Sequence, residues 1–169
     1  SMKYKRHWLA LALVFFFSFA VLISQGVKLH RSLPPIPERV VDTNGAALFA
    51  GESIHQGQNV WQSLGGQQVG SIWGHGSYVA PDWTADYLHR ESVFILNTWA
   101  NAESGRNYDA LDSEKQAVLR QRLQDMLRKN TYDEATGKIT VDPLRAKAFE
   151  DNLKHYSDVF ANGNKDYAI

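Results

Sequence analysis

The segment from Trp8 to Ile23 constrains this chain most strongly, because Ser18 is its only polar residue. Residues 24–27 extend the apolar run to about 20 residues, the length that a helix needs to cross a hydrocarbon core of about 30 Å. A charged side chain at the centre of such a helix costs about 2.5–3.5 kcal/mol on insertion. None occurs in this run. The sequence therefore predicts a transmembrane anchor helix over residues 8–29.

The residues before this run predict its orientation. Lys3, Lys5 and Arg6 lie within residues 1–7, and positive charge favours the cytoplasmic side of a membrane. We therefore expect residues 1–7 in the cytoplasm and everything after the helix outside it. A cleaved signal peptide is the alternative, but its apolar core is about 7–15 residues long and ends in small residues. The run here is longer, and no Ala-x-Ala pattern follows it.

Composition excludes several kinds of site. The 18 Lys and Arg residues balance the 18 Asp and Glu residues, and no basic block follows the first few residues. We therefore expect no nucleic acid partner. The chain has no cysteine. This excludes disulfides, thiolate metal sites and the Cys-x-x-Cys-His attachment of c-type haem.

Beyond the anchor, residues 30–38 contain Pro34, Pro35 and Pro37, which predict a stiff spacer. One domain is expected over residues 39–169. The pair Asn44-Gly45 separates two short apolar segments and predicts a β-hairpin with positive φ at both turn residues. A Thr-Gly pair within residues 131–141 predicts a second hairpin.

Four helices are predicted in this domain. Ser53 is expected to cap a helix over residues 54–64, and Thr84 a helix over residues 85–102. Ser113 begins a capping box, and Asp142-Pro143 begins the last helix. The residues expected on the buried sides of these last two helices are Val118, Leu119, Leu123, Met126, Leu127, Phe149, Leu153, Tyr156 and Phe160. The predicted fold class is mainly α, with one N-terminal transmembrane helix and small β-hairpins.

The most specific pattern is the glycine-rich run over residues 57–83, GQNVWQSLGGQQVGSIWGHGSYVAPDW. Together with the anchor and the sequence PPIPERVV at residues 34–41, it resembles the start of the quinol-dependent bacterial nitric oxide reductases. Weaker similarity continues through residues 88–91 and 143–147. The resemblance implies an extracytoplasmic, cytochrome c-like domain on the bacterial inner membrane. The catalytic bundle of those enzymes, with two b-type haems and a non-haem iron, is absent from this chain.

The resemblance also places the haem c attachment. In the cytochrome-dependent relatives, a Gly-x-x-Val-Trp helix leads into Cys-x-x-Cys-His. That pentapeptide falls on Gly66, Gln67, Gln68, Val69 and Gly70, where both thiols and the axial histidine are missing. We therefore expect this chain to hold no haem c and no other cofactor. Electrons for the full enzyme would come from a membrane quinol.

A calcium site is implied in the same way. A Gly-Ala-Tyr segment of the relatives helps to hold calcium beside the haem propionates, and the matching positions are Gly76 and Tyr78. Calcium takes about six to eight oxygen ligands, so these two residues would need further ligands from the catalytic bundle. No second histidine lies three or four residues from His75, so a histidine metal pair is not expected.

Other candidate residues have ordinary interpretations. Met126 could be a distal haem ligand, but its apolar neighbours favour core packing. Four tryptophans could line a quinol pocket, although bulky aromatics mostly fill interiors. They are Trp61, Trp73, Trp83 and Trp99. Four carboxylates could deliver protons, although exposed helix faces are the usual place for them. They are Asp82, Asp86, Glu91 and Glu103.

Two functional hypotheses follow. In the first, the chain is the non-catalytic N-terminal module of a quinol-dependent nitric oxide reductase that converts nitric oxide to nitrous oxide and water. Its partners would be membrane lipid, the catalytic bundle of the same polypeptide and quinol, and alone it would be inactive. In the second, it is a stand-alone, membrane-anchored binding domain. Ser1 before Met2 and the unfinished segment at residues 166–169 favour artificial ends, so the reading frame beyond codon 169 would separate the two.

Overall fold

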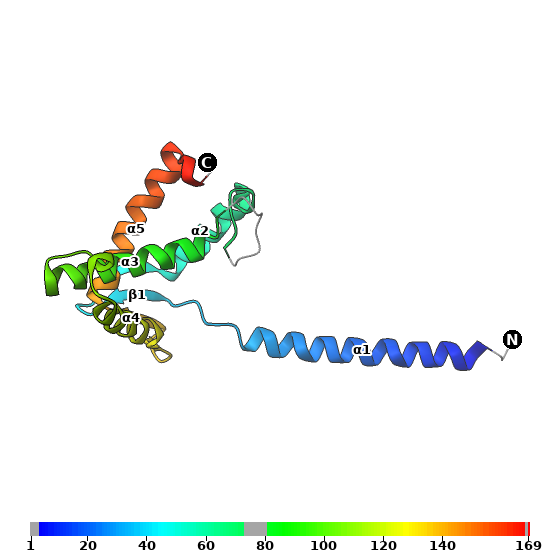
Figure 1. Ribbon diagram of the computed structural model, residues 1–169. Coiled ribbons are helices and arrows are strands. Elements are labelled where there is room, and N and C mark those ends of the chain that lie inside the picture. Colours follow the sequence, from blue (N-terminus) through cyan, green and yellow to red (C-terminus); the bar gives the residue numbers. More distant parts are fainter. Residues whose placement is uncertain (1–3, 73–80, 168) are drawn as a thin grey trace. The chain divides into compact units, whose positions relative to one another are not determined.

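The computed structural model describes residues 4–72, 81–167 and 169, in two units, residues 1–36 and 37–169. The first unit contains the helix α1, Lys5–Arg31, drawn in blue in Figure 1. By length and composition, it is the one helix among the described residues that could cross a membrane. None of its side chains is buried within the chain. Its last turn carries Lys28, His30 and Arg31, so the apolar surface ends in positive charge.

The second unit contains one small mixed sheet. Its strands are β1 (Arg39–Asp42), β2 (Ala47–Ala50), β3 (Tyr132–Asp133) and β4 (Lys138–Val141), in the order β2-β1-β4-β3. Both predicted hairpins form, because β1 pairs antiparallel with β2 and β3 with β4. The central pair, β1 with β4, is parallel and joins the two hairpins. This pairing was not predicted, since the two strands lie far apart in the sequence.

The turn of the first hairpin differs from the prediction. The Gly45 N–H donates to the Asp42 carbonyl at 3.1 Å, which closes the turn over Thr43 and Asn44. Oδ1 of Asp42 also accepts from the N–H groups of Asn44 and Ala46, each at 2.8 Å. Gly45 has a φ of 85°, which glycine adopts without a steric penalty. The expected central pair Asn44-Gly45 is therefore wrong, because the Asp42 carboxylate sets the turn one residue earlier.

Four helices of the second unit surround the sheet and the core. They are α2 (Gly51–Ser63), α3 (Trp83–Ser104), α4 (Ser113–Arg128) and α5 (Pro143–Asn162). Short 3₁₀ turns lie at Gly66–Gln68 (η2), Tyr108–Ala110 (η3) and Lys165–Tyr167 (η4). The described part of the chain thus has five α-helices and one small sheet (Figure 1). The predicted, mainly helical fold class is confirmed.

Three predicted helix caps are wrong. Asp82 caps α3 in place of Thr84, since its side chain accepts from the Thr84 and Ala85 N–H groups. Asp112 caps α4 in place of Ser113, with its Oδ1 2.9 Å from the Lys115 nitrogen. The Asp carboxylates lie one or two positions earlier and reach the free N–H groups of the first turn. Ser53 lies inside α2, whose cap residue makes no side-chain hydrogen bond.

α2 begins early because strand β2 runs directly into it. The Gly51 N–H donates to the Glu38 carbonyl at 2.8 Å. A Cβ at this position would collide with the Pro37 carbonyl oxygen. Glycine at the strand-to-helix junction therefore lets the chain pass close to the segment before β1.

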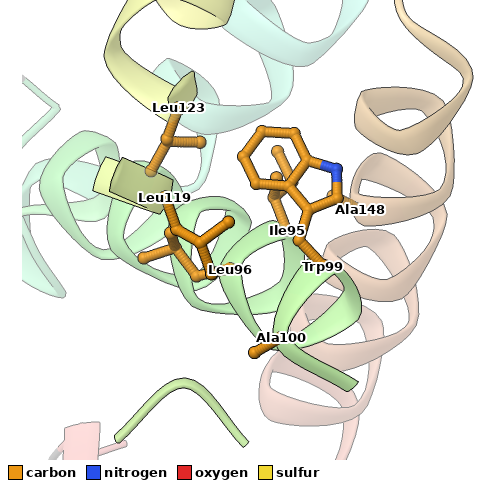
Figure 2. Packing of buried hydrophobic residues seen from close by; sticks show 7 residues of the cluster. All are labelled: Ile95, Leu96, Trp99, Ala100, Leu119, Leu123 and Ala148. Atoms are coloured by element: carbon orange, nitrogen blue, oxygen red, sulfur yellow. The ribbon is translucent and has the colours of Figure 1, made fainter. Parts of the chain in front are cut away.

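The hydrophobic core lies between α3, α4 and α5 (Figure 2). Its buried residues are Ile95, Leu96, Trp99, Ala100, Leu119, Leu123 and Ala148. Met126 packs against this cluster, as predicted. Val118 is 63% exposed, so its predicted burial is wrong.

The buried side of α5 also differs from the prediction. Leu153 and Phe160 are 55% and 50% exposed, whereas Ala148 and Asn152 are 1% exposed. Small residues let α5 approach α3 closely, and the larger residues are displaced to the edge of the contact. Asn152 is satisfied there, because its Oδ1 accepts from Arg90 Nε at 3.0 Å.

Candidate functional site

The segment between α2 and α3 contains the five positions at which the sequence predicted a lost haem attachment. Gly65 has a φ of 67° and follows the end of α2, and η2 comes next. Ser71 then pairs with the start of α3. Its N–H donates to the Pro81 carbonyl at 3.0 Å, and its carbonyl accepts from the Trp83 N–H at 2.8 Å. Residues 66–70 are therefore held between two fixed helices.

Gly66 and Gly70 are both buried, and each has an indole ring against it. A Cβ on Gly66 would collide with the six-membered ring of Trp61. A Cβ on Gly70 would collide with Nε1 and Cδ1 of Trp83. These are the first and last positions of the pentapeptide, where the relatives carry a thiol and the axial histidine. The residues present therefore do not fit haem c, because indoles occupy the space that its ligands would need.

The two indoles are part of an aromatic cluster between α2, α3 and α5. The rings of Trp83 and Phe160 have centroids 5.2 Å apart, and Trp61 meets Phe160 edge-on at 6.4 Å. The cluster borders a cavity of about 420 Å³. Its walls are almost wholly apolar and are formed by Trp61, Ile72, Trp83, Thr84, Tyr87, Leu88, Tyr156 and Phe160. Trp61 Nε1 and Trp83 Nε1 are buried and find no hydrogen-bond partner among the described residues. Packing therefore holds both indoles in place.

The tryptophans thus follow the interpretation as interior residues, with one exception. Trp83 and Trp99 are each 9% exposed, and Trp61 is half-buried. Trp73 lies outside the described residues.

Asp86 is the centre of a hydrogen-bonded cluster beside these aromatics. Its Oδ2 accepts from the hydroxyls of Tyr156 at 2.7 Å and Tyr167 at 2.9 Å. His155 Nε2 lies 3.0 Å from the Tyr167 hydroxyl. Burial and the neighbouring Asp86 carboxylate raise the pKa of both tyrosines above its ordinary value of 10.0. Both phenols therefore remain protonated donors, and η4 is tied to α3. No sequence pattern pointed to Tyr167, because this contact spans 81 residues.

Glu91 is buried, with 1% exposure, so its interpretation as an exposed carboxylate is wrong. Arg145 Nε donates to its Oε1 at 2.7 Å, which pairs the charge inside the domain. The other three candidate carboxylates behave differently. Asp82 caps α3, Asp86 is half-buried, and Glu103 is exposed and pairs with Arg122 at 3.0 Å. The segments 88–91 and 143–147, which carried weak family similarity, are brought together by this ion pair.

The described residues hold no group of three or more His, Asp or Glu side chains that could bind a metal. The expected calcium contacts, Gly76 and Tyr78, lie outside the part of the chain that the structure describes, as does His75. The calcium site therefore stays a prediction.

Comparison with protein families now assigns this unit. A model for the cytochrome c-like domain of NorB, a nitric oxide reductase protein, matches residues 37–169. The chain belongs to this family. A search of curated proteins found no match. The expected N-terminal region of a nitric oxide reductase is thereby confirmed. Membership and helix α1 together suggest a membrane anchor, and the family suggests a haem-containing enzyme.

Proposed function

We propose that this chain is the N-terminal, non-catalytic module of a quinol-dependent nitric oxide reductase. The observation that carries the proposal is the pair of indoles on Gly66 and Gly70 in a domain of the cytochrome c-like family. A domain that keeps this scaffold without room for haem c has no redox group of its own. A membrane quinol then supplies the electrons directly to the catalytic bundle, whose b-type haems and non-haem iron reduce nitric oxide.

The module is anchored by α1, with residues 1–7 in the cytoplasm and the second unit outside the cytoplasmic membrane. The positive residues before the apolar run support this orientation. The length of α1, 27 residues, supports a spanning position, since about 20 suffice to cross the hydrocarbon core.

The role of the module is to cover the outer side of the catalytic bundle. Apolar side chains near η2 support this role, because Val60, Leu64 and Val69 are 55%, 79% and 36% exposed. Large apolar groups that gather on a surface mark interaction sites. The catalytic bundle of the same polypeptide is the partner we propose for this surface.

The test compares the 169-residue chain with a protein that continues into the bundle. We expect quinol-dependent nitric oxide reduction and b-type haem in the longer protein only. Covalent haem that survives acid-acetone extraction of the short chain would contradict the proposal. So would catalytic activity in the short chain, or a stop codon directly after codon 169.

A matched pair of variants tests the covering role. Leu64→Glu places a charge at the proposed contact, and Val118→Glu places one on the exposed face of α4. In the longer protein, we expect Leu64→Glu to lower activity at least severalfold and Val118→Glu to leave it unchanged. Equal activities would show that the surface near η2 does not contact the bundle.

A further inference from the structure

A second cavity, of about 320 Å³, lies between the sheet and the helices α3 and α5. Protein interiors hold few voids larger than one water molecule, whose share of liquid volume is about 30 Å³. Ligand pockets begin at about 300 Å³. This cavity therefore has room for one small organic molecule.

One side of the cavity is apolar. Val40 of β1, Phe49 of β2, and Ile139 and Val141 of β4 line it, and Phe149 of α5 completes the wall. The rings of Phe49 and Phe149 lie 5.2 Å apart and close this side. The body of an occupant would therefore be apolar.

The other side of the cavity carries charge from Glu91, Arg145 and Lys129. Glu91 is paired with Arg145, at 2.7 Å through Nε and 3.5 Å through Nη2. A guanidinium has five N–H donors, so Arg145 keeps donors that Glu91 does not use. Lys129 makes no ion pair among the described residues. Asp142 lines an adjoining pocket with both cations but not this cavity. Two cations against one buried anion favour an anionic occupant.

We propose that this cavity binds a small organic monoanion, a carboxylate on an apolar ring or short chain. The carboxylate contacts Lys129 and Arg145, and the apolar body lies against Val40, Phe49 and Ile139. This site is separate from the aromatic cluster and does not depend on the function proposed above.

The test uses the full chain in nanodiscs of zwitterionic lipid, with para-fluorobenzoate as the probe. Fluorine NMR measures its binding, and empty nanodiscs correct for partition into lipid. For a ligand of this size we expect a Kd of about 1 mM. The neutral isostere para-fluorobenzyl alcohol should bind at least about threefold more weakly, since it cannot pair with the cations. Equal affinities for the two probes would overturn the proposal.

Two matched pairs of variants locate the site. Lys129→Ala should weaken para-fluorobenzoate binding about threefold or more and leave the alcohol unchanged, whereas Lys138→Ala, an exposed lysine on β4, should change neither. Ile139→Trp fills the cavity and should abolish binding of both probes, whereas Val118→Trp on the exposed face of α4 should not. If Ile139→Trp fails to fold by circular dichroism, the lysine pair decides. Unchanged para-fluorobenzoate affinity in Lys129→Ala would place any binding elsewhere and refute the site.

Discussion

At the scale of single residues, the second unit depends on polar side chains buried with specific partners. Glu91 and Arg145 come from α3 and α5, and their ion pair is 54 residues apart in the sequence. Asp86 joins Tyr156 and Tyr167 in the same way. A buried carboxylate is tolerated only when it is paired and hydrogen-bonded, so each of these contacts constrains how the helices pack.

Removal of Arg145 should destabilise the domain strongly. Arg145→Ala leaves the Glu91 carboxylate buried without a partner, and breaking such a pair costs about 3–5 kcal/mol. Urea unfolding monitored by tryptophan fluorescence measures the loss. Arg122→Ala is the matched control, because its exposed pair with Glu103 and its contact with the Trp99 ring should together cost about 1 kcal/mol. Similar losses for the two variants would show that burial of Glu91 does not matter.

Alkaline stability should depend on Tyr156. Burial and its hydrogen bond to Asp86 raise the pKa of this tyrosine in the folded state above 10.0. The unfolded chain then ionises first, so stability is fully present below pH ~10 and falls as the pH rises beyond it. We expect the melting temperature of the native chain to fall between pH 9 and pH 11, and Tyr156→Phe to fall less steeply. A parallel decline in the two proteins would contradict this origin of the pH dependence.

At the scale of elements, aspartate caps decide where the helices begin. The predicted serine and threonine caps are all displaced by structure nearby in the chain. In α3 and α4 the preceding aspartates reach the first-turn N–H groups, and in α2 the strand β2 continues directly into the helix. Asp142 caps α5 before Pro143, as the Asp-Pro pair predicted.

The cap of α4 can be tested with neighbouring residues. Asp112→Ala removes the acceptor of the Lys115 N–H and should lower the melting temperature by a few degrees. Ser113→Ala, one residue later, should leave it nearly unchanged, since Ser113 lies within the helix. Thermal unfolding followed by circular dichroism compares them. A larger effect of Ser113→Ala would restore the capping box expected from the sequence.

At the scale of the whole molecule, the cytochrome c-like scaffold has exchanged a cofactor pocket for aromatic packing. Trp61 comes from α2 and Trp83 from the start of α3, and both lie on glycines of the segment between these helices. The exchange therefore joins three elements. Changing one glycine alone would disturb all three.

Rebuilding the haem attachment should fail in this scaffold. Gly66→Cys, Val69→Cys and Gly70→His together restore the Cys-x-x-Cys-His pattern, but both indoles stand where the new side chains must go. Expressed with a cytochrome c maturation system, the triple variant should carry far less than one covalent haem per chain, as measured by pyridine haemochrome spectra. Stoichiometric haem would show that the indoles do not occupy the ligand positions.

A simpler variant measures the same crowding. Gly66→Ala should destabilise the domain by about 1–3 kcal/mol through overpacking against Trp61. Gln67→Ala, at an exposed neighbouring position, should stay within about 0.5 kcal/mol of the native chain. Urea unfolding compares them, and equal stabilities would mean that Trp61 yields easily.

The sequence by itself determined the features that short-range patterns encode. The apolar run predicts α1, helical spacing and turn residues predict four more helices and two hairpins, and the lack of cysteine excludes thioether-linked haem. The tertiary structure alone decided the parallel pairing of β1 with β4, the burial of Glu91 against Arg145 and the placement of Trp61 and Trp83 on glycines. The physical reason is range. A helix or turn is stabilised by residues a few positions apart, whereas these contacts form only after distant segments pack together.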